Sequence, residues 1–501
     1  MILNPLLSKT MKKILFIFFC ISTSTTFLHA QNITWYNTDN ECNDILHVDC
    51  LPKILGEDND NCYTYIQAKN NNYSIEAISK VDKKIKYSKQ YNANKQGHNV
   101  SIKKTLLINK KIILITEEYN TLNKTYGLYY TIYNSQTGIL EEKHSQLPLN
   151  TIEQKSAEFG SLVTNIFISK NNSKILLIQQ FYDQNTNLST NYFSLLNQNL
   201  ENLNTTENNS DEQDFDKDIQ HILDEDGTLY FLDKKLNLIS YDVENNYNKW
   251  SEKIHFNNLN LDLGSTIYDL TLKMNEKNEI CLFGVYVKKQ KTHDISGYVY
   301  IKIKTKSLEI ISEKIIPLEP SFIKDVNDHS GKINTKPRLK VINLNNGDII
   351  LKSELSYWSN VVLNNDLILS KISSNGQLKW TIRIPKRQLF KHGYPSYLPF
   401  YSHSCFIDDE NLQLLFNDHP KNNFTTQNSL NLKTMDSYKK SKISVYTISI
   451  KTGTYTTKSI TRTNKDEPFL LNSLSYQKNQ GSSAFLFGKN QSNYSFGIFT
   501  K

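Results

Sequence analysis

Short apolar runs recur along the chain, and each follows a turn rich in Asn, Asp, Lys or Gly. Each run has the length of a β-strand and is too short for a buried helix. The runs are almost continuously apolar, as expected of strands that are covered on both faces. The eight runs are Tyr63–Gln67, Ile112–Thr116, Ile175–Gln179, Thr228–Leu232, Ile280–Gly284, Ile349–Lys352, Leu412–Asn417 and Ala484–Gly488. They predict a repeat of eight units.

A second pattern lies between these runs. The central residues of successive runs are 49 to 71 residues apart, a mean period of about 60, which is near the range typical of propellers and other repeat arrays. After most runs comes a hairpin, in which two strand-like segments flank a short polar or Gly turn. Clear hairpins begin at Thr131, Ile239, Ile301, Ser370 and Ile448, and three of their turns contain Gly138, Gly376 or Gly453, where a positive φ is expected.

One period therefore holds a leading strand, a buried second strand and a hairpin of two more strands. Four antiparallel strands per period define a blade of a β-propeller, an all-β fold. Eight blades are favoured, and seven remain the alternative if the first unit is partial. Residues 31–501 are expected to form this single domain, without an amphipathic helix. The rival interpretation, two consecutive all-β domains, lacks a Pro/Gly/Ser linker to separate them.

The two ends of the repeat predict how the ring closes. The segment from Asn493 resembles the third strand of the first unit and is followed by no fourth strand. The segment Ile33–Tyr36 precedes the first complete unit and can supply that strand. Pairing of the N- and C-terminal segments would remove strand edges that otherwise favour aggregation.

The hairpin Ser370–Trp380 (SKISSNGQLKW), with weaker copies at Thr131 and Ile448, resembles the strand, Gly turn and terminal Trp of exported bacterial β-propeller repeat proteins of the quinoprotein-like and related secreted-repeat type. In that family the terminal Trp recurs and docks between blades. Here only Trp250 and Trp380 occupy the position. The resemblance therefore implies the propeller, while a quinone cofactor has no support, and no cofactor is expected.

The N-terminus has the pattern of an export signal. Lys12 and Lys13 precede an apolar run from Ile14, and Ala30 offers a small residue at a cleavage point. We interpret residues 1–30 as a signal peptide and expect a periplasmic or extracellular protein. Lipidation at Cys20 is disfavoured because Phe19 stands where a small residue is needed. The chain contains no apolar stretch of the roughly 20 residues that a membrane span requires.

The charge and the cysteines narrow the function further. The net charge is +8, but only four residues are Arg and the Lys residues are dispersed, which argues against a nucleic-acid partner. A monomer is expected. In an oxidising compartment, Cys50 and Cys62 are the preferred disulfide among three N-terminal cysteines that include Cys42. A zinc site formed by these cysteines with His47 is disfavoured because their spacing matches no compact zinc motif.

Catalytic and metal motifs are weak. No Gly-x-Ser-x-Gly elbow, His-Glu-x-x-His helix or phosphate-binding Gly loop occurs, and the Ser373 turn only approaches the sialidase motif. Alternating acids at 211–218 and the shorter run Asp58–Asp60 supply oxygen ligands of the kind that calcium prefers. Neither completes a calcium loop, so we favour solvated loops and predict no metal.

The segment Trp380–Ser404 is the most unusual stretch, because it combines basic residues with aromatic ones between two blades. Loops on a rigid scaffold often carry function, and such side chains could hold an anionic glycan or a peptide. The alternative, which we favour, is that the aromatics pin the loop to the blades. The candidate ligand-binding residues are Arg383, Arg387, His392, Tyr394, Tyr397, Tyr401 and His403.

Two functions follow from these patterns. The first is a non-catalytic binding or scaffold module with an unknown ligand. The alternative is a glycan-active enzyme or lectin with a pocket on the central face. An enzyme of this kind would need two carboxylates about 5 to 10 Å apart.

Overall fold

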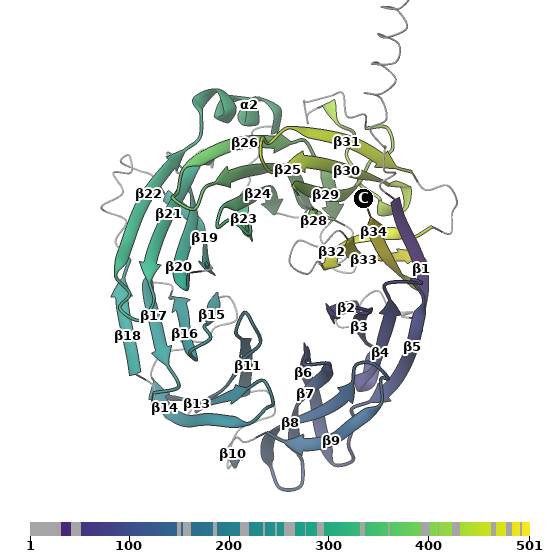
Figure 1. The fold of residues 1–501 in the computed structure, drawn as a ribbon, viewed down its shortest axis with the longest axis vertical. Helices are drawn as coiled ribbons and strands as arrows, with labels where there is room; N and C mark the ends of the chain where they lie inside the picture. Colours follow the sequence, from purple (N-terminus) through teal and green to yellow (C-terminus); the bar gives the residue numbers. More distant parts are fainter. Residues whose placement is uncertain are drawn as a thin grey trace, which may run out of the picture.

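Eight four-stranded antiparallel sheets stand around a central opening in the computed structural model, which is the architecture of an eight-bladed β-propeller (Figure 1). The predicted fold and blade number are confirmed. The structure describes residues 32–41, 52–147, 152–153, 162–183, 188–210, 220–233, 236–245, 248–254, 266–275, 277–287, 295–330, 336–358, 361–391, 401–408, 410–422, 431–461, 467–476, 483–490 and 493–500.

The innermost strand of each blade lines the central opening. In order from blade 1 to blade 8, these strands are β2 (Pro52–Glu57), β6 (His98–Ile108), β11 (Leu162–Ile168), β15 (His221–Leu223), β19 (Thr266–Met274), β23 (Lys336–Asn343), β28 (Ser404–Asp408) and β32 (Phe469–Tyr476).

The second strands contain the eight apolar runs. They are β3 (Asn61–Gln67), β7 (Lys111–Asn120), β12 (Lys174–Asp183), β16 (Thr228–Leu232), β20 (Glu279–Val287), β24 (Ile349–Trp358), β29 (Asn411–Asp418) and β33 (Ser483–Asn490). On β7, Ile113 and Ile115 pack toward blade 3, whereas Ile112 and Leu114 pack toward blade 1. Successive strand residues point to opposite faces, so a strand between two blades must be apolar at every position.

The outer half of each blade is a hairpin. The third strands are β4 (Asn72–Ser79), β8 (Thr125–Asn134), β13 (Leu188–Asn197), β17 (Asn237–Asp242), β21 (Ile295–Lys304), β25 (Val361–Ile372), β30 (Lys442–Ser449) and β34 (Asn493–Thr500). The fourth strands are β5 (Ile85–Asn92), β9 (Leu140–Gln146), β14 (Asn202–Ser210), β18 (Asn248–Lys253), β22 (Ile310–Pro317), β26 (Leu378–Ile384), β31 (Tyr455–Ile460) and β1 (Asn32–Glu41). Two short strands, β10 (Ile152–Glu153) and β27 (Gln388–Lys391), extend blades 2 and 6.

Blade 8 combines both ends of the repeat. Strand β1 pairs antiparallel with β34, from Asn32 opposite Thr500 to Glu41 opposite Asn493. The aromatic ring of Trp35 lies directly over Gly488 and Gly497, where a Cβ atom would come within 2.6 and 2.7 Å of it. The predicted closure of the ring by the N-terminal segment is thus confirmed.

One α-helix departs from the prediction. Helix α2 (Pro320–Ser330) connects blades 5 and 6, and short 3-10 turns occur at Lys69–Asn71 and Tyr438–Lys440. Pro320 begins α2, where its missing N–H costs no helical hydrogen bond. Val326 is buried, and Ile323 packs against the same cluster of blades 5 and 6. The expectation that no amphipathic helix would occur is therefore wrong. Among the described residues, no helix is long and apolar enough to cross a membrane.

Candidate ligand-binding channel

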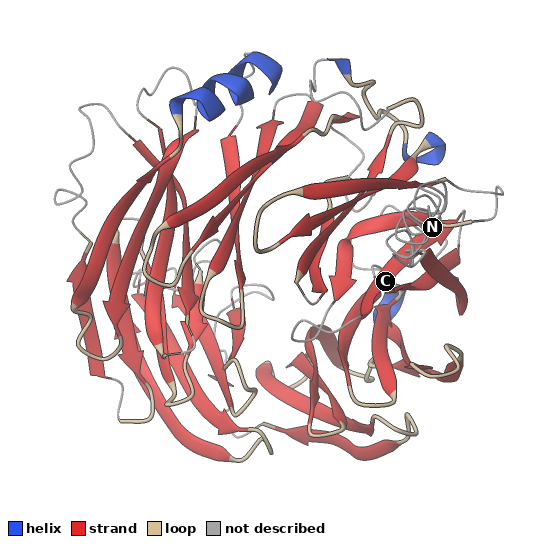
Figure 2. Cartoon of the chain, turned by 45° about the horizontal axis from the view of Figure 1, so that its top comes forward, coloured by secondary structure: helices blue, strands red, loops and turns tan. Residues whose placement is uncertain are grey.

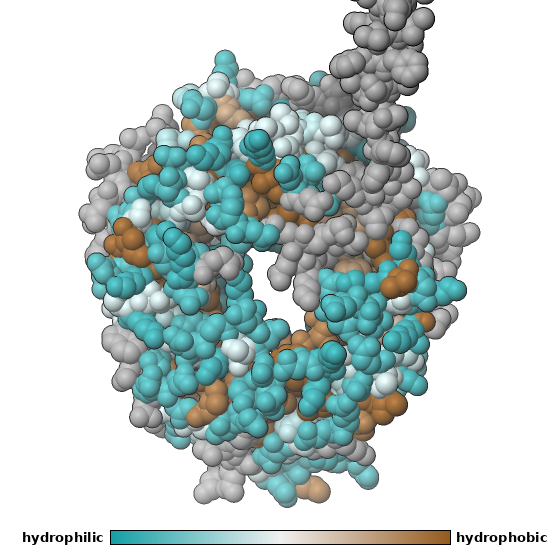
Figure 3. Space-filling view, in the orientation of Figure 1, coloured by the Kyte–Doolittle hydropathy of each residue, from teal (hydrophilic) through white to brown (hydrophobic). Residues whose placement is uncertain are grey.

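A cavity of about 900 Å³ lies in the central opening. Its lining comes from the inner strands β6, β11, β15, β19 and β23 and from the turns that follow several of them. The space-filling view shows an open passage with a mainly hydrophilic rim (Figure 3). Central channels of this size can accommodate a small molecule.

Lysine side chains give this cavity its chemical character. Lys104 on β6, Lys273 on β19 and Lys340 on β23 line it, and all three are solvent-exposed. Lys53, on the adjacent inner strand β2, is also exposed. Within the described part of the chain, none of the four forms an ion pair or a side-chain hydrogen bond. These ammonium groups are therefore available to a ligand.

The protein around the channel makes the charges of Lys104 and Lys273 less favourable. Burial within the protein lowers the pKa of Lys104, and the positive charge of Lys53 lowers it further. Burial likewise lowers the pKa of Lys273. Although exposed to channel solvent, both lysines have enough protein around them to lose part of their hydration. An anion at this position would relieve the repulsion and regain the lost stabilisation.

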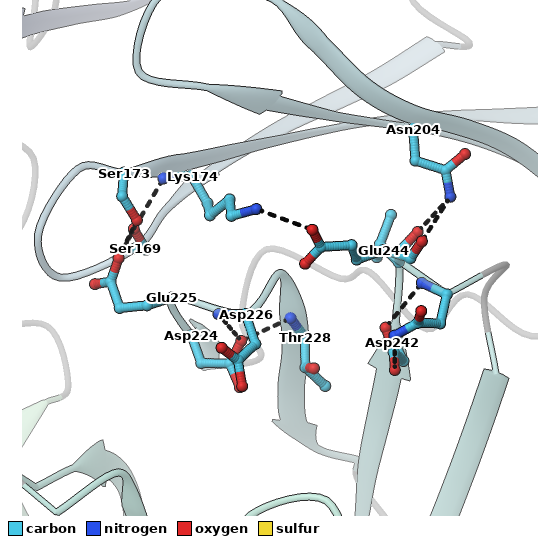
Figure 4. Close-up of polar contacts among 12 residues, drawn as sticks. Ser169, Ser173, Lys174, Asn204, Asp224, Glu225, Asp226, Thr228, Asp242 and Glu244 are labelled. Atoms are coloured by element: carbon cyan, nitrogen blue, oxygen red, sulfur yellow. Dashed lines mark hydrogen bonds and ion pairs between the residues drawn. The ribbon is translucent and has the colours of Figure 1, made fainter.

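Two carboxylates at the cavity edge belong to a turn and form no ion pair with Lys104, Lys273 or Lys340. Asp224 Oδ1 accepts hydrogen bonds from the backbone N–H groups of Asp226 and Thr228, at 3.0 and 2.7 Å (Figure 4). Glu225 accepts hydrogen bonds from Ser169, at 2.8 Å, and from Ser173. Burial raises the pKa of Asp224, whereas in Glu225 the hydrogen bonds outweigh burial and lower the pKa.

This acidic turn also limits the enzyme alternative. Asp224 and Glu225 are neighbours in sequence, and each is already held by turn hydrogen bonds. They are the only carboxylates among the lining residues that the structure describes. A glycoside hydrolase needs one acid and one base or nucleophile on either side of a bound sugar. The described lining does not supply that arrangement.

The residues predicted from the Trp380–Ser404 segment have a different environment. Arg383 donates hydrogen bonds to Asp325 of α2 at 2.9 Å and to Asp366 at 3.0 Å, and its side chain is only 6% exposed. Tyr401 is buried, and its hydroxyl group lies 3.4 Å from the carbonyl oxygen of Asp436. Arg387 is half-buried. The candidates His392, Tyr394 and Tyr397 lie outside the described residues.

His403 belongs to a buried polar cluster between blades 6 and 7. Its Nδ1 atom lies 3.1 Å from Ser402 Oγ, which donates a hydrogen bond to Glu354 Oε2 at 2.8 Å. Lys386 is fully buried and forms an ion pair with Glu354. Burial lowers the pKa of His403 to about 3, and the charge of Lys352 adds to this effect. His403 is therefore neutral near pH 7, in a cluster that joins two blades.

Thus the structure brings Arg383, Tyr401 and His403 near the junction of blades 6 and 7, but as packed side chains. The interpretation that this segment is pinned to the blades fits these positions better than an exposed ligand site does. Sequence reasoning missed the channel lysines. The available signal was a lysine inside the strand that precedes an apolar run, as in Ser101–Ile108 and Leu339–Leu344. A strand pattern alone does not reveal which polar residue faces a channel.

The cysteines and acidic residues that were considered as disulfide or metal sites lie partly within the described residues. Cys62 is a free, buried thiol, so the preferred Cys50–Cys62 disulfide is not formed, and Cys42 and Cys50 lie outside the described residues. Asp58 accepts hydrogen bonds from the backbone of Asp60 and Asn61 and acts as a turn cap. The acidic cluster at 211–218 also lies outside the described residues. Elsewhere in the described chain, no group of three or more His, Cys, Asp or Glu is placed to hold a metal.

Comparisons with known proteins identify no family. No family model matches the chain, and no curated protein matches it. Among solved structures, an uncharacterized protein from Listeria monocytogenes has a TM-score of 0.38 at 10% identity, covering 78% of this chain and 90% of its own. The β-propeller domain of the Trilobed protease from Pyrococcus furiosus has a TM-score of 0.35 at 8% identity, and the match covers 80% of this chain and 93% of that domain's chain.

A putative 6-phosphogluconolactonase from Bacteroides fragilis is similar at the same level. Its TM-score is 0.34 at 9% identity, and the match covers 78% of this chain and 96% of the lactonase chain. Likenesses this weak carry no argument about activity. The class of this protein is defined by its own structure, an eight-bladed propeller with a lysine-lined channel, and such a scaffold is suited to binding.

Proposed function

We propose that this propeller is a binding module that takes an anionic ligand into its central channel. One observation carries the proposal: Lys104, Lys273 and Lys340 line a single cavity, and no described carboxylate pairs with them. Protein sites rarely hold several partly desolvated cations together unless a partner or a ligand compensates them. An oxyanion would supply that compensation through charge-assisted hydrogen bonds.

Calorimetric titration at low ionic strength tests this function. The probes are orthophosphate, citrate and tripolyphosphate, and the variant is K104Q/K273Q/K340Q. We expect at least one probe to bind the unmodified protein, with at least tenfold weaker binding to the variant. The control variant K84Q/K86Q/K451Q removes three exposed charges from turns and an outer strand, and should retain at least a third of the affinity. Equal losses in both variants, or no binding of any probe, would refute the proposal.

The proposal includes export of the protein, with residues 1–30 removed as a signal peptide. Its support is the pattern of Lys12, Lys13 and the apolar run before Ala30. Expression of the full chain in a bacterium, followed by fractionation and N-terminal sequencing, should give a periplasmic or secreted protein that begins at Gln31. A cytoplasmic protein that retains Met1 or Met11 would contradict export.

A further inference from the structure

Lys53 is not among the residues that line the cavity, but it lies on the inner strand next to that of Lys104, so that Lys53, Lys104, Lys273 and Lys340 fall into two pairs on opposite sides of the opening. Lys53 and Lys104 belong to blades 1 and 2, and Lys273 and Lys340 belong to blades 5 and 6. In a closed ring of eight blades, blade 1 stands opposite blade 5 and blade 2 opposite blade 6. Figure 1 shows strands β2 and β6 on one side of the opening and β19 and β23 across from them.

Strands β2 and β6 contact each other, as do β19 and β23, so each pair lies on two neighbouring inner strands. On the first wall, the charge of Lys53 lowers the pKa of Lys104 beyond the effect of burial. On the opposite wall, the backbone N–H of Leu339 donates a hydrogen bond to the side-chain carboxylate of Asp269, which connects β23 with β19. Lys340 also lies opposite Lys352 in the register of β23 and β24. Burial lowers the pKa of Lys352, and the positive charge of Lys340 lowers it further.

The wall between the two pairs has a different character. The inner strands of blades 3 and 4 line the cavity with Ile166, Phe167 and Ile222, together with the ring of His221. That ring packs against Phe167, with centroids 4.7 Å apart. The described lysine that lines the cavity on this wall is Lys170, in the turn after β11, and its charge lowers the pKa of the nearby Glu225. The lining lysines that form no ion pair with a described residue, Lys104, Lys273 and Lys340, therefore lie on two opposite walls of the cavity.

We infer that the channel ligand carries two or more separated oxyanion groups and bridges the two lysine pairs. This inference rests on the proposed function, because it specifies the ligand of the same channel. One compact anion can neutralise only one pair. Connecting two anionic groups makes the second contact intramolecular, which raises the affinity without any additional protein contact. Phosphate, sulfate and carboxylate groups share the chemistry that Lys recognises.

Two series of ligands test the bridge by calorimetry. The first is orthophosphate, pyrophosphate, tripolyphosphate and longer linear polyphosphates of defined length. The second is acetate and α,ω-dicarboxylates of increasing length. We expect two orthophosphate ions per protein, but one long polyphosphate per protein, with affinity rising at least tenfold at the length that spans the channel. The series that binds more tightly identifies the oxyanion.

Variants that remove one pair at a time distinguish bridging from simple charge attraction. In K53Q/K104Q or in K273Q/K340Q, orthophosphate should bind with a stoichiometry of one. The spanning polyphosphate should lose at least tenfold in affinity in either variant. The matched variant K84Q/K86Q removes the same charge from the outer edge of blade 1. It should still bind two orthophosphate ions, and its affinity for the spanning polyphosphate should stay within threefold of that of the unmodified protein. Circular dichroism and thermal unfolding verify that each variant is folded.

Two results would overturn the bridge while leaving the proposed function intact. One is binding of orthophosphate and of every polyphosphate at the same single site. The other is an affinity that follows the total charge of the anion, without a threshold in length. If no anion of either series binds, the proposed function itself fails. The outcomes for the general and the specific proposal are therefore separable.

Discussion

At the scale of single residues, charge is present inside the molecule as well as in the channel. Lys386 has no exposed surface and pairs with Glu354, whose side chain is 9% exposed. Gln388 Oε1 lies 3.3 Å from Lys386 Nζ and also accepts a hydrogen bond from the backbone N–H of Ser402. The attraction of Lys386 lowers the pKa of Glu354 well below its usual value, despite the opposing effect of burial.

Removing one partner of this pair should be costly. We expect Lys386→Met to destabilise the protein by about 3 to 5 kcal/mol, because it leaves the Glu354 carboxylate buried without its cation. The double variant E354L/K386M should regain a large part of that loss. Urea unfolding of the two single variants and the double variant measures the coupling between these residues.

An exposed ion pair in the same protein provides the control. Lys306 and Asp226 are 3.0 Å apart, but their side chains are 70% and 64% exposed. Because water and salt screen such pairs, Lys306→Met should leave the urea midpoint of unfolding nearly unchanged. Similar losses in K306M and K386M would show that burial does not set the energy of the Lys386 pair.

At the scale of elements, glycine turns on outer hairpins connect neighbouring blades. The Gly138 turn of blade 2 lies against Tyr87 of β5, and the Gly376 turn of blade 6 lies against Tyr300 of β21. The Gly453 turn of blade 7 lies against Trp380 of β26, whose indole N–H donates a 3.0 Å hydrogen bond to the carbonyl oxygen of Ile450. The turn of one blade thus receives an aromatic side chain of the previous blade.

Gly453 and Gly97 separate the two reasons for a glycine at a turn. Their φ angles are +75° and +74°, but a Cβ at Gly453 would lie 2.8 Å from the Trp380 ring, whereas one at Gly97 would have nothing within 4 Å. Gly97→Ala should cost about 1 kcal/mol from backbone strain alone. Gly453→Ala should cost about 1 to 3 kcal/mol more. Thermal unfolding measures both variants, and equal losses would contradict a role for Trp380 contact.

The elements were largely predictable because their cause is local. A strand packed between two blades needs apolar residues on both faces, so Ile112–Thr116 identifies β7 without knowledge of its neighbours. Gly376 and Gly453 likewise indicate turns because their backbone requires a positive φ. Helix α2 escaped prediction because it is short and few of its residues whose burial the structure describes are buried. The roles of Arg383 and Lys104 depend on residues far away in sequence, which no local pattern contains.

At the scale of the whole molecule, the closed ring places the channel lysines opposite one another. A change that opens the ring should therefore disturb the channel as well as stability. The seam lies in blade 8, where β1 completes the sheet of β32, β33 and β34. Ile33 and Trp35 of β1 pack against a cluster that includes Leu470 and Phe499.

Trp35→Ala tests this seam. We expect a loss of about 2 to 4 kcal/mol, because the substitution leaves a cavity above Gly488 and Gly497 that the two glycines cannot fill. Val81→Ala is the control, since Val81 is 83% exposed and its truncation should change stability by about 0.5 kcal/mol or less. Chemical unfolding measures both. An equally small effect of W35A would show that the seam does not depend on this packing.

The pairing of Asn32 with Thr500 also sets an order of events in time. Nearly the whole chain lies between these two residues, so this contact has the largest loop to close. During synthesis from the N-terminus, β1 is the first of the described strands to be made, but it cannot pair until β34, the last of them, has appeared. Blades 1 to 7 can assemble from consecutive segments, whereas blade 8 must wait for both. The first strand to leave the ribosome is thus among the last to be paired.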